Sequence, residues 1–279
     1  MTTPLRLALG QMNSAGTHDA NIATMRDLAA RADAGGAHML CLPEVAGLMQ
    51  RDGAKARAQV VEAGADPFIA ACREVAAARA LWMQPGSTPV LGPDGRFLNH
   101  ATMIGPDGAL VAEYDKIHLF DVAIEGEKPI GESKRFAPGE TGVVIDTPWG
   151  ALGMTICYDL RFPQLYRAEA QAGARLIFVP SAFTVPTGRA HWEVLLRARA
   201  IETGAWIVAA AQTGAHEDGR ETWGHSLVVD PWGRVVCDMG DAPGLEVVEI
   251  DLDQSDKARK QIPSLANDRP FTIARRGGA

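Results

Sequence analysis

The chain has 279 residues, 47% of them hydrophobic and 22% charged, which is typical of a globular protein with one large α/β domain or two small ones. Its 34 acidic and 27 basic side chains give a formal net charge of −7, and without a basic stripe to pair with phosphates we expect no nucleic-acid partner. The sequence shows no secretory signal, no apolar run near the roughly 20 residues of a membrane span, and no metal-ligand spacing among its cysteines, so we expect a cytoplasmic protein without a membrane or metal partner.

The first eighty residues alternate strand and helix patterns. The apolar segment 5–12 predicts a strand, and a second buried strand is expected at 38–44. Between them lies a predicted helix that ends at Gly35 and Gly36, and one of its faces carries Ile22, Met25, Leu28, Ala29 and Ala32. A further helix over about 66–80 and a short strand complete an order that is typical of βαβ units.

The middle of the chain has a different pattern. The turn sequence GPDG occurs at 92–95 and at 105–108, and Asp-Gly turns between apolar segments predict an antiparallel meander from about 88 to 115. Residues 120–140 have no clean period and contain Gly, Pro and charged residues, which predicts a long loop. Because long loops in compact domains are usually functional, we expect this one to border the site and to admit only small substrates.

From residue 142 onward the strand and helix patterns return. Strands are expected at 142–146, 151–156, 175–180, 205–212 and 245–252, with a hairpin over 224–240 and helices from about Pro163 and over 190–204. No Ser/Gly/Pro-rich linker divides the chain. The sequence therefore favours a single domain over residues 1–279, built from two mixed sheets flanked by helices.

Glu44, Lys116 and Cys157 are polar residues that stand where apolar strands end. Each has an ordinary structural interpretation when taken alone: a surface carboxylate, a solvated lysine and a small core cysteine. Together they are chemically complete for nucleophilic catalysis, because a carboxylate can take the thiol proton and an ammonium can stabilise an oxyanion. A helix beginning just beyond Cys157 would also point its N-terminal dipole near the sulfur and favour the thiolate.

The sequences around these three residues resemble the signature blocks of the nitrilase superfamily, the carbon–nitrogen hydrolases. The blocks are CLPE around Glu44, YDKIHLFD around Lys116 and GMTICYDLRFPQLYR around Cys157, in the order that the family has. FAPGE (136–140) and VDPWG (229–233) also fit, so the resemblance covers nearly the whole chain. One departure is Ala46, because many relatives have an aromatic residue two positions after the glutamate.

The resemblance implies a four-layer αββα sandwich and an enzyme without a cofactor. It implies that Glu44 is the general base, Lys116 the oxyanion stabiliser and Cys157 the nucleophile, with the backbone N–H of Tyr158 completing the oxyanion hole. It also implies a homodimer or a higher homo-oligomer.

A second active-site glutamate, frequent in the family, corresponds best to Glu132, with Glu125 and Glu127 as nearby alternatives. Further residues follow the ends of strands that would border the site and are expected to contact the substrate: Arg161, Ser181, Phe183 and Thr184. Alternatively, Arg161 forms an internal ion pair with Asp159 or another carboxylate. Phe183 could likewise pack beneath the pocket instead of lining it.

A competing hypothesis is a Cys–His pair, as in thiol proteases. It requires His118, His191 or His225 near Cys157, and His118 would share a strand face with Lys116. No thiol-protease signature flanks these histidines. Structural hydrogen-bonding roles are therefore favoured for His191 and His225.

Within the superfamily, residues 181–214 and 220–233 resemble the Nit branch of amidases, and AAAQTGAH (209–216) is closer to the deaminated glutathione amidases than to the ω-amidases. The sequence thus favours an amidase that cleaves a small primary amide through a cysteine thioester, with deaminated glutathione as the expected substrate. The alternatives are an ω-amidase acting on α-ketoglutaramate, a nitrilase or N-carbamoyl amidase, and a non-catalytic interaction protein on the same fold.

Overall fold

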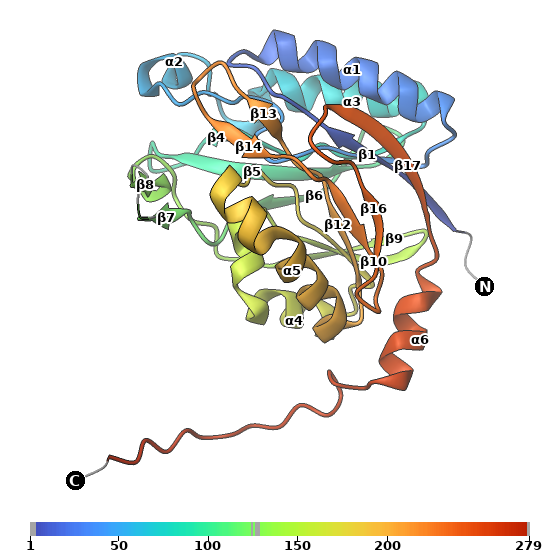
Figure 1. The fold of residues 1–279 in the computed structure, drawn as a ribbon. Helices are drawn as coiled ribbons and strands as arrows, with labels where there is room; N and C mark the ends of the chain where they lie inside the picture. Colours follow the sequence, from blue (N-terminus) through green and yellow to red (C-terminus); the bar gives the residue numbers. More distant parts are fainter. Residues whose placement is uncertain (1–3, 124, 126–128, 278–279) are drawn as a thin grey trace.

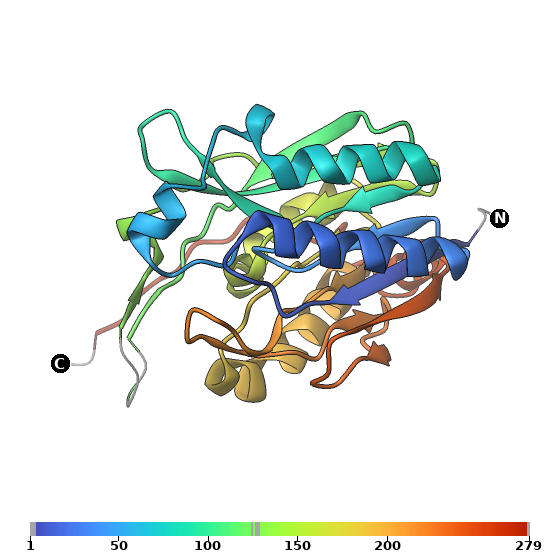
Figure 2. The ribbon, with the colours of Figure 1, turned by 90° about the horizontal axis from the view of Figure 1, so that it is seen from above.

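The computed structural model describes residues 4–123, 125 and 129–277. In this part of the chain two large mixed sheets stack face to face, and helices cover their outer faces (Figure 1, Figure 2). The expected αββα layering is confirmed.

The first large sheet has the strand order β17-β1-β2-β3-β5-β4, with β6 also paired to β5. Strands β1, β2 and β3 run parallel, whereas the meander β4–β5–β6 and the last strand β17 pair antiparallel. The strands are β1 Leu5–Gln11, β2 Met39–Cys41, β3 Trp82–Gln84, β4 Ser87–Leu91, β5 Phe97–Ile104, β6 Leu110–Asp115 and β17 Gly244–Ile250.

The second large sheet has the order β16-β15-β12-β11-β10-β9, with β10, β11 and β12 parallel. Its strands are β9 Val143–Thr147, β10 Gly150–Met154, β11 Leu176–Phe178, β12 Trp206–Ala209, β15 Leu227–Val229 and β16 Val235–Asp238. Two small hairpins lie outside both sheets, formed by β7 Asp121–Val122 with β8 Ile130–Gly131 and by β13 Thr213–Ala215 with β14 Glu221–Trp223.

Alternation along the strands sends side chains into separate cores. Leu5, Leu7 and Leu9 of β1 point to the core between the sheets, whereas Ala8 packs in the core beneath the helices of the first sheet. Helices α1 His18–Ala34 and α3 Pro67–Arg79 cover that sheet, and α4 Pro163–Gln171 and α5 Val185–Thr203 cover the other (Figure 1). The short helix α2 Gly53–Arg57 and the helix α6 Asp253–Gln261 complete the set.

Local chemistry explains where the main helices begin and end. The Asp66 side chain accepts hydrogen bonds from the N–H groups of Phe68 and Ile69, each 2.9 Å long, and Pro67 fits the first turn of α3. Helix α5 ends at Gly204, whose φ of 59° is left-handed. The start of α3 and the end of α5 are therefore fixed by local side-chain and backbone chemistry.

Several sequence-based boundaries need correction. Helix α5 begins at Val185 rather than at residue 190, because Pro186 is accommodated in its first turn. Strands expected at 38–44 and 205–212 are shorter, and the expected loop 120–140 contains β7, β8 and a 3₁₀ turn, Glu132–Lys134. Helices α2 and α6 and the hairpin β13–β14 were not predicted. Among the described residues, no helix has the length and apolar character needed to cross a membrane.

Candidate active site

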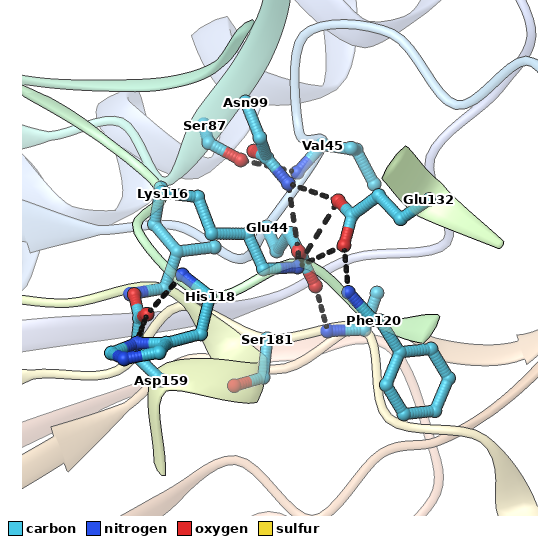
Figure 3. Close-up of polar contacts among 12 residues, drawn as sticks. Glu44, Val45, Ser87, Asn99, Lys116, His118, Phe120, Glu132, Asp159 and Ser181 are labelled. Atoms are coloured by element: carbon cyan, nitrogen blue, oxygen red, sulfur yellow. Dashed lines mark hydrogen bonds and ion pairs between the residues drawn. The ribbon is translucent and has the colours of Figure 1, made fainter. Parts of the chain in front are cut away.

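Glu44 lies directly beyond β2 and is only 5% exposed. Its Oε1 atom accepts hydrogen bonds from Lys116 Nζ at 2.8 Å and from Asn99 Nδ2 at 2.9 Å, and its Oε2 atom accepts one from the N–H of Ala182, also at 2.9 Å (Figure 3). Three donors from three different segments thus compensate the burial of this carboxylate.

The backbone around Glu44 is held in a strained conformation. Val45 has a φ of 50°, which is unfavourable for a β-branched residue, and its N–H donates to the Ser87 hydroxyl at 2.9 Å. Gly86 permits this close approach, because a Cβ atom there would lie 1.7 Å from the carbonyl oxygen of Pro43. From the other side, the Gln212 amide donates to the Glu44 carbonyl at 2.9 Å. The direction of the Glu44 side chain is therefore fixed by its surroundings.

Lys116 follows β6 and is 2% exposed. Its ammonium lies 2.8 Å from Glu44 and 2.9 Å from Glu132, so one cation bridges two carboxylates (Figure 3). Burial alone lowers the pKa of a lysine, but Glu132 and Glu44 outweigh it and hold the pKa of Lys116 well above its ordinary value. Lys116 is therefore a fixed positive charge in this pocket.

Glu132 is brought to the site by the segment that the sequence analysis treated as a functional loop. Its Oε2 atom accepts a 2.6 Å hydrogen bond from the N–H of Phe120, and both of its oxygens contact the Lys116 ammonium. Of the alternatives, Glu125 is exposed and Glu127 lies outside the described residues. Glu132 is thus the second glutamate that the structure places against Lys116.

Cys157 lies at the start of the 3₁₀ helix Cys157–Arg161, beyond the end of β10. Its φ is 46°, and its N–H donates to the carbonyl of Pro180 at 2.9 Å. The thiol lies close enough to the Glu44 carboxylate and the N–H of Ala182 for both to influence its pKa. Burial, reinforced by the Glu44 charge, raises the pKa of the thiol well above its ordinary value, although Lys116 and the Ala182 N–H act in the opposite direction.

The expectation that a helix dipole favours the Cys157 thiolate is therefore wrong for the unliganded protein. The α-helix begins only at Pro163, and burial with the neighbouring carboxylate outweighs the short 3₁₀ turn. The resting cysteine is a protonated thiol with an acceptor already in place.

Asp159 connects the segment carrying Cys157 with the segment carrying Lys116. This fully buried carboxylate accepts hydrogen bonds from Tyr114 Oη at 2.6 Å, the Ile156 N–H at 2.8 Å and the His118 N–H at 3.0 Å. The ring nitrogen Nδ1 of His118 lies 2.7 Å from it as well (Figure 3). His118 is thus paired with Asp159, which leaves Glu44 as the carboxylate next to the Cys157 thiol.

The other two histidines have partners of their own. His191 is exposed, and its Nδ1 lies 3.3 Å from an Arg161 nitrogen. His225 Nδ1 lies 3.0 Å from Asp238. Neither interacts with the thiol of Cys157, whose pKa is influenced by Glu44, Lys116 and Ala182.

The expected substrate contacts fall into two groups. The Arg161 guanidinium lies over the rings of Tyr158 and Phe183, at 5.8 and 5.7 Å, and is not paired with Asp159. In the other group, Ser181 is fully buried and donates its hydroxyl to the carbonyl of Val179, so this side chain already has a partner within the protein. Thr184 precedes α5 and shares a 2.8 Å hydroxyl contact with Thr187.

Sequence analysis missed four residues that hold the site together: Ser87, Asn99, Asp159 in its bridging role, and Gln212. Each is a buried polar side chain, and the sequence signal was a polar residue inside or beside an apolar strand. No group of three or more metal-binding side chains is found in the described part of the chain.

A sequence model of the carbon–nitrogen hydrolase family matches residues 6–260. The chain belongs to the carbon–nitrogen hydrolase family. It is 40% identical to the deaminated glutathione amidase of Bos taurus and 39% identical to that of Homo sapiens, each over 95% of this chain and 82% of the relative. Family membership makes it an enzyme that hydrolyses carbon–nitrogen bonds.

Solved structures agree with this assignment. The C. elegans NitFhit protein superposes with a TM-score of 0.89 at 37% identity, over 96% of this chain and 66% of that one. The Saccharomyces cerevisiae Nit3 protein, a member of branch 10 of the nitrilase superfamily, gives a TM-score of 0.83 at 27% identity, over 93% and 94% of the two chains. An amidase mutant from Nesterenkonia sp. AN1, which carries acrylamide on its active-site cysteine, gives 0.77 at 30% identity, over 93% and 98%.

Proposed function

We propose that this chain hydrolyses the C–N bond of a small primary amide to ammonia and a carboxylic acid, with Cys157 as nucleophile. The observation that carries the proposal is that the Cys157 thiol lies next to a Glu44 carboxylate, which also binds the Lys116 ammonium. A nucleophile, a base and a fixed positive charge within one buried pocket are the groups that acyl transfer requires. The cysteine adduct of the Nesterenkonia amidase supports the choice of nucleophile.

The first half-reaction makes a thioester. Glu44 takes the thiol proton while the Cys157 sulfur attacks the amide carbon, and the oxyanion is held by Lys116 Nζ and the N–H of Tyr158. When the tetrahedral intermediate collapses, the C–N bond breaks and Glu44 gives its proton to the departing ammonia. The acyl group is then bonded to sulfur.

The second half-reaction consumes water. Glu44 removes a proton from a water molecule, positioned with the help of Glu132, as the water oxygen attacks the thioester carbon. Collapse breaks the C–S bond, the proton returns to sulfur, and the carboxylic acid leaves. The protein needs no cofactor in this scheme, since sulfur, carboxylate and ammonium supply every step.

We propose deaminated glutathione as the substrate. The relatives of that name support this choice, because they are 37–46% identical to this chain. Arg161 supports a substrate with a carboxylate, since its guanidinium faces aromatic rings and has no carboxylate partner within 4.0 Å in the described part of the chain. Tyr158 and Phe183 would line the same side of the pocket.

We also propose that residues 1–279 work as one hydrolase domain in a cytoplasmic homodimer or larger homo-oligomer. Site residues come from both large sheets, which supports a single domain. Beyond α6 the chain leaves the body as an extended arm, on which Phe271 and Ile273 are 82% and 85% exposed (Figure 1). An arm with two exposed apolar side chains is suited to contact with a second copy, and the mass in solution tests this proposal.

The deciding experiment measures ammonia release by the purified protein with deaminated glutathione and α-ketoglutaramate in parallel. We expect faster release from deaminated glutathione, and a loss of about 10⁴-fold or more in Cys157→Ala. Cys72→Ala is the matched control, because Cys72 is a buried cysteine on α3 and should leave the rate unchanged. Preference for α-ketoglutaramate would overturn the substrate, and near-native activity of Cys157→Ala would overturn the mechanism.

A further inference from the structure

Asn99 lies in the middle of the polar cluster, although the scheme above gives it no task. It is a residue of β5, is 2% exposed, and its backbone carbonyl accepts the N–H of Lys116 at 3.0 Å. Its side-chain nitrogen Nδ2 lies 2.9 Å from Glu44 Oε1 and 3.3 Å from Glu132 Oε1 (Figure 3). One amide nitrogen therefore donates to both carboxylates.

The oxygen of the Asn99 amide is placed at a cost in folding free energy. Its Oδ1 atom is buried and has no hydrogen-bond partner among the described residues. Leaving a buried acceptor unsatisfied costs about 1–3 kcal/mol, which offsets the stability that the two hydrogen bonds from Nδ2 contribute. The opposite orientation of the amide would place oxygen against two carboxylates, which fixes the NH₂ group toward the glutamates.

The hydrogen bonds of Lys116 explain why the glutamates need this second donor. The ammonium has three N–H groups, and it contacts Glu44 Oε1 at 2.8 Å, Glu132 Oε2 at 2.9 Å and Glu132 Oε1 at 3.2 Å. When Lys116 turns one N–H toward a substrate oxyanion, the longest contact is the first to be lost. Glu132 Oε1 is the oxygen that Asn99 also contacts.

We propose that Asn99 is a positioning residue, which keeps Glu44 and Glu132 side by side as ionised acceptors while Lys116 binds the oxyanion. The amide suits this task because it donates two hydrogen bonds without adding charge to a pocket of two carboxylates and one ammonium. The proposal rests on the proposed function. It adds a residue that acts through Glu44 and Glu132 and does not touch the substrate.

The titratable groups that face the Asn99 side chain are Glu44 beyond β2, Glu132 on its 3₁₀ turn and Lys116 beyond β6, with Cys157 next to Glu44. His100 follows on β5 and therefore points to the opposite face, where it pairs with Asp115 and Glu113. A change at Asn99 should thus be felt by the carboxylate pair before any other titrating group.

The experiment compares the wild type with Asn99→Leu and Asn99→Asp. The rate of ammonia release is measured from about pH 5 to about pH 9, together with the rate at which acrylamide adds to Cys157 and the urea midpoint of unfolding. Thr88→Val is the matched control, because Thr88 Oγ1 is also buried without a partner, on the strand paired with β5, and contacts neither glutamate.

For Asn99→Leu we expect kcat/KM to fall about 10- to 100-fold and the acidic limb of both pH profiles to move up by about one unit, because a donor to the ionised pair is lost. Asn99→Asp should move the limb further, since it adds a third negative charge. The urea midpoint of Asn99→Leu should change little, because removal of the unsatisfied Oδ1 opposes the loss of two hydrogen bonds to the glutamates. The midpoint of Thr88→Val should stay equal or rise, and its pH profiles should not move.

An unmoved acidic limb in Asn99→Leu would overturn the proposal, as would a loss of activity that merely follows a loss of stability. The acrylamide reaction separates this result from a failure of the proposed function. If the wild type released no ammonia from any amide, the pH profile of Cys157 alkylation would still show whether Asn99 controls the acceptor next to the thiol.

Discussion

Glu44 and Glu169 are both buried, and Glu132 beside Glu44 is only 13% exposed, but the surroundings of the active-site pair and of Glu169 are built in opposite ways. Around Glu44 and Glu132 every carboxylate oxygen has at least one donor, whereas the backbone at Val45 and Cys157 is forced to φ values of 50° and 46°. Glu169 lies in the regular helix α4, is 3% exposed, and neither of its carboxylate oxygens has a partner among the described residues.

The difference shows how the active site and the region beneath α4 each accommodate a carboxyl group away from solvent. At the site, charge is compensated and strain is concentrated in the backbone, which fixes the directions of Glu44 and Cys157. Under α4 the backbone is relaxed, and burial, reinforced by Asp159, raises the pKa of Glu169 well above its ordinary value. One region stabilises its ions by supplying donors, whereas burial in the other favours the neutral form of the carboxyl group.

Removing the Lys116 ammonium should leave the active-site carboxylates without enough hydrogen-bond donors. Lys116→Met leaves Glu44 and Glu132 facing each other without their shared ammonium, so we expect a loss of about 3–5 kcal/mol in unfolding free energy at neutral pH. Ammonia release should fall about 10³-fold or more, because the oxyanion also loses its cation. Urea unfolding and initial rates measure the two effects.

The double variant Lys116→Met/Glu132→Gln is the control for this reasoning. It removes one of the two charges left without compensation and should recover part of the stability, but none of the activity. If Lys116→Met were as stable as the wild type, the ammonium would not be what makes the pair of buried carboxylates tolerable.

Asp159 allows an intermediate test, because it is a buried carboxylate with a full set of donors but lies outside the reacting groups. In Asp159→Asn one acceptor oxygen becomes an NH₂ group that faces existing donors, so stability should fall by about 2–4 kcal/mol. Activity should fall about 10- to 100-fold, since Asp159 joins Ile156 beside the nucleophile to His118 beside Lys116.

Tyr114→Phe provides the comparison for Asp159→Asn. It removes one donor to Asp159 and leaves the carboxylate with the others, so we expect a loss of only about 1–3 kcal/mol. Equal losses of activity in the two variants would contradict a bridging role for the carboxylate itself.

Most of the fold could be predicted from the chain because it depends on local pattern. The short apolar run of β1 and the two Asp-Gly turns of the meander could be recognised in the sequence, and both lie where expected. The start of α5 could not be predicted, since Pro186 and Gly188 suggest a break in the helix. Only the fold reveals that Gly188 makes room for Trp223, whose Cγ would lie 2.2 Å from an added Cβ atom.

The site residues also divide into those that local sequence predicts and those that depend on the packed fold. Glu44, Lys116 and Cys157 could be predicted because each stands at or shortly beyond the end of a strand, within a sequence block that resembles those of the family. Asn99 is hidden within a strand, and its partners lie 55 and 33 residues away in sequence. Pairings over such separations are set by how the sheets and loops pack, which no local pattern encodes.

Glu169 supplies the reverse experiment, in which an unsatisfied group is removed. Its folded pKa is raised above the ordinary 4.5, so the folded state holds the proton more tightly than the unfolded state, and stability falls as pH rises above about 4.5. Glu169→Met should therefore be more stable than the wild type by about 1–3 kcal/mol at pH 8, with a smaller gain near pH 4.5.

Thermal or urea unfolding at the two pH values tests the Glu169 prediction. Glu249→Met is its control, because Glu249 is exposed on β17 and should show no pH-dependent gain. A gain of the same size at both pH values would mean that packing, and not the buried carboxyl group, limits stability beneath α4.

The smallest expected effect concerns the strained side of the comparison. In Val45→Gly, relief of the left-handed strain, about 1–3 kcal/mol, opposes the loss of a buried valine side chain, so the net change in unfolding free energy should stay within about 1 kcal/mol. Val228→Gly, at a fully buried strand position without that strain, should lose about 2–5 kcal/mol. Activity of Val45→Gly should still fall several-fold, about 3- to 10-fold, because the freer backbone no longer fixes Glu44. If Val45→Gly were as damaging to stability as Val228→Gly, the φ of 50° would carry no strain, and the site would differ from Glu169 only in its hydrogen bonds.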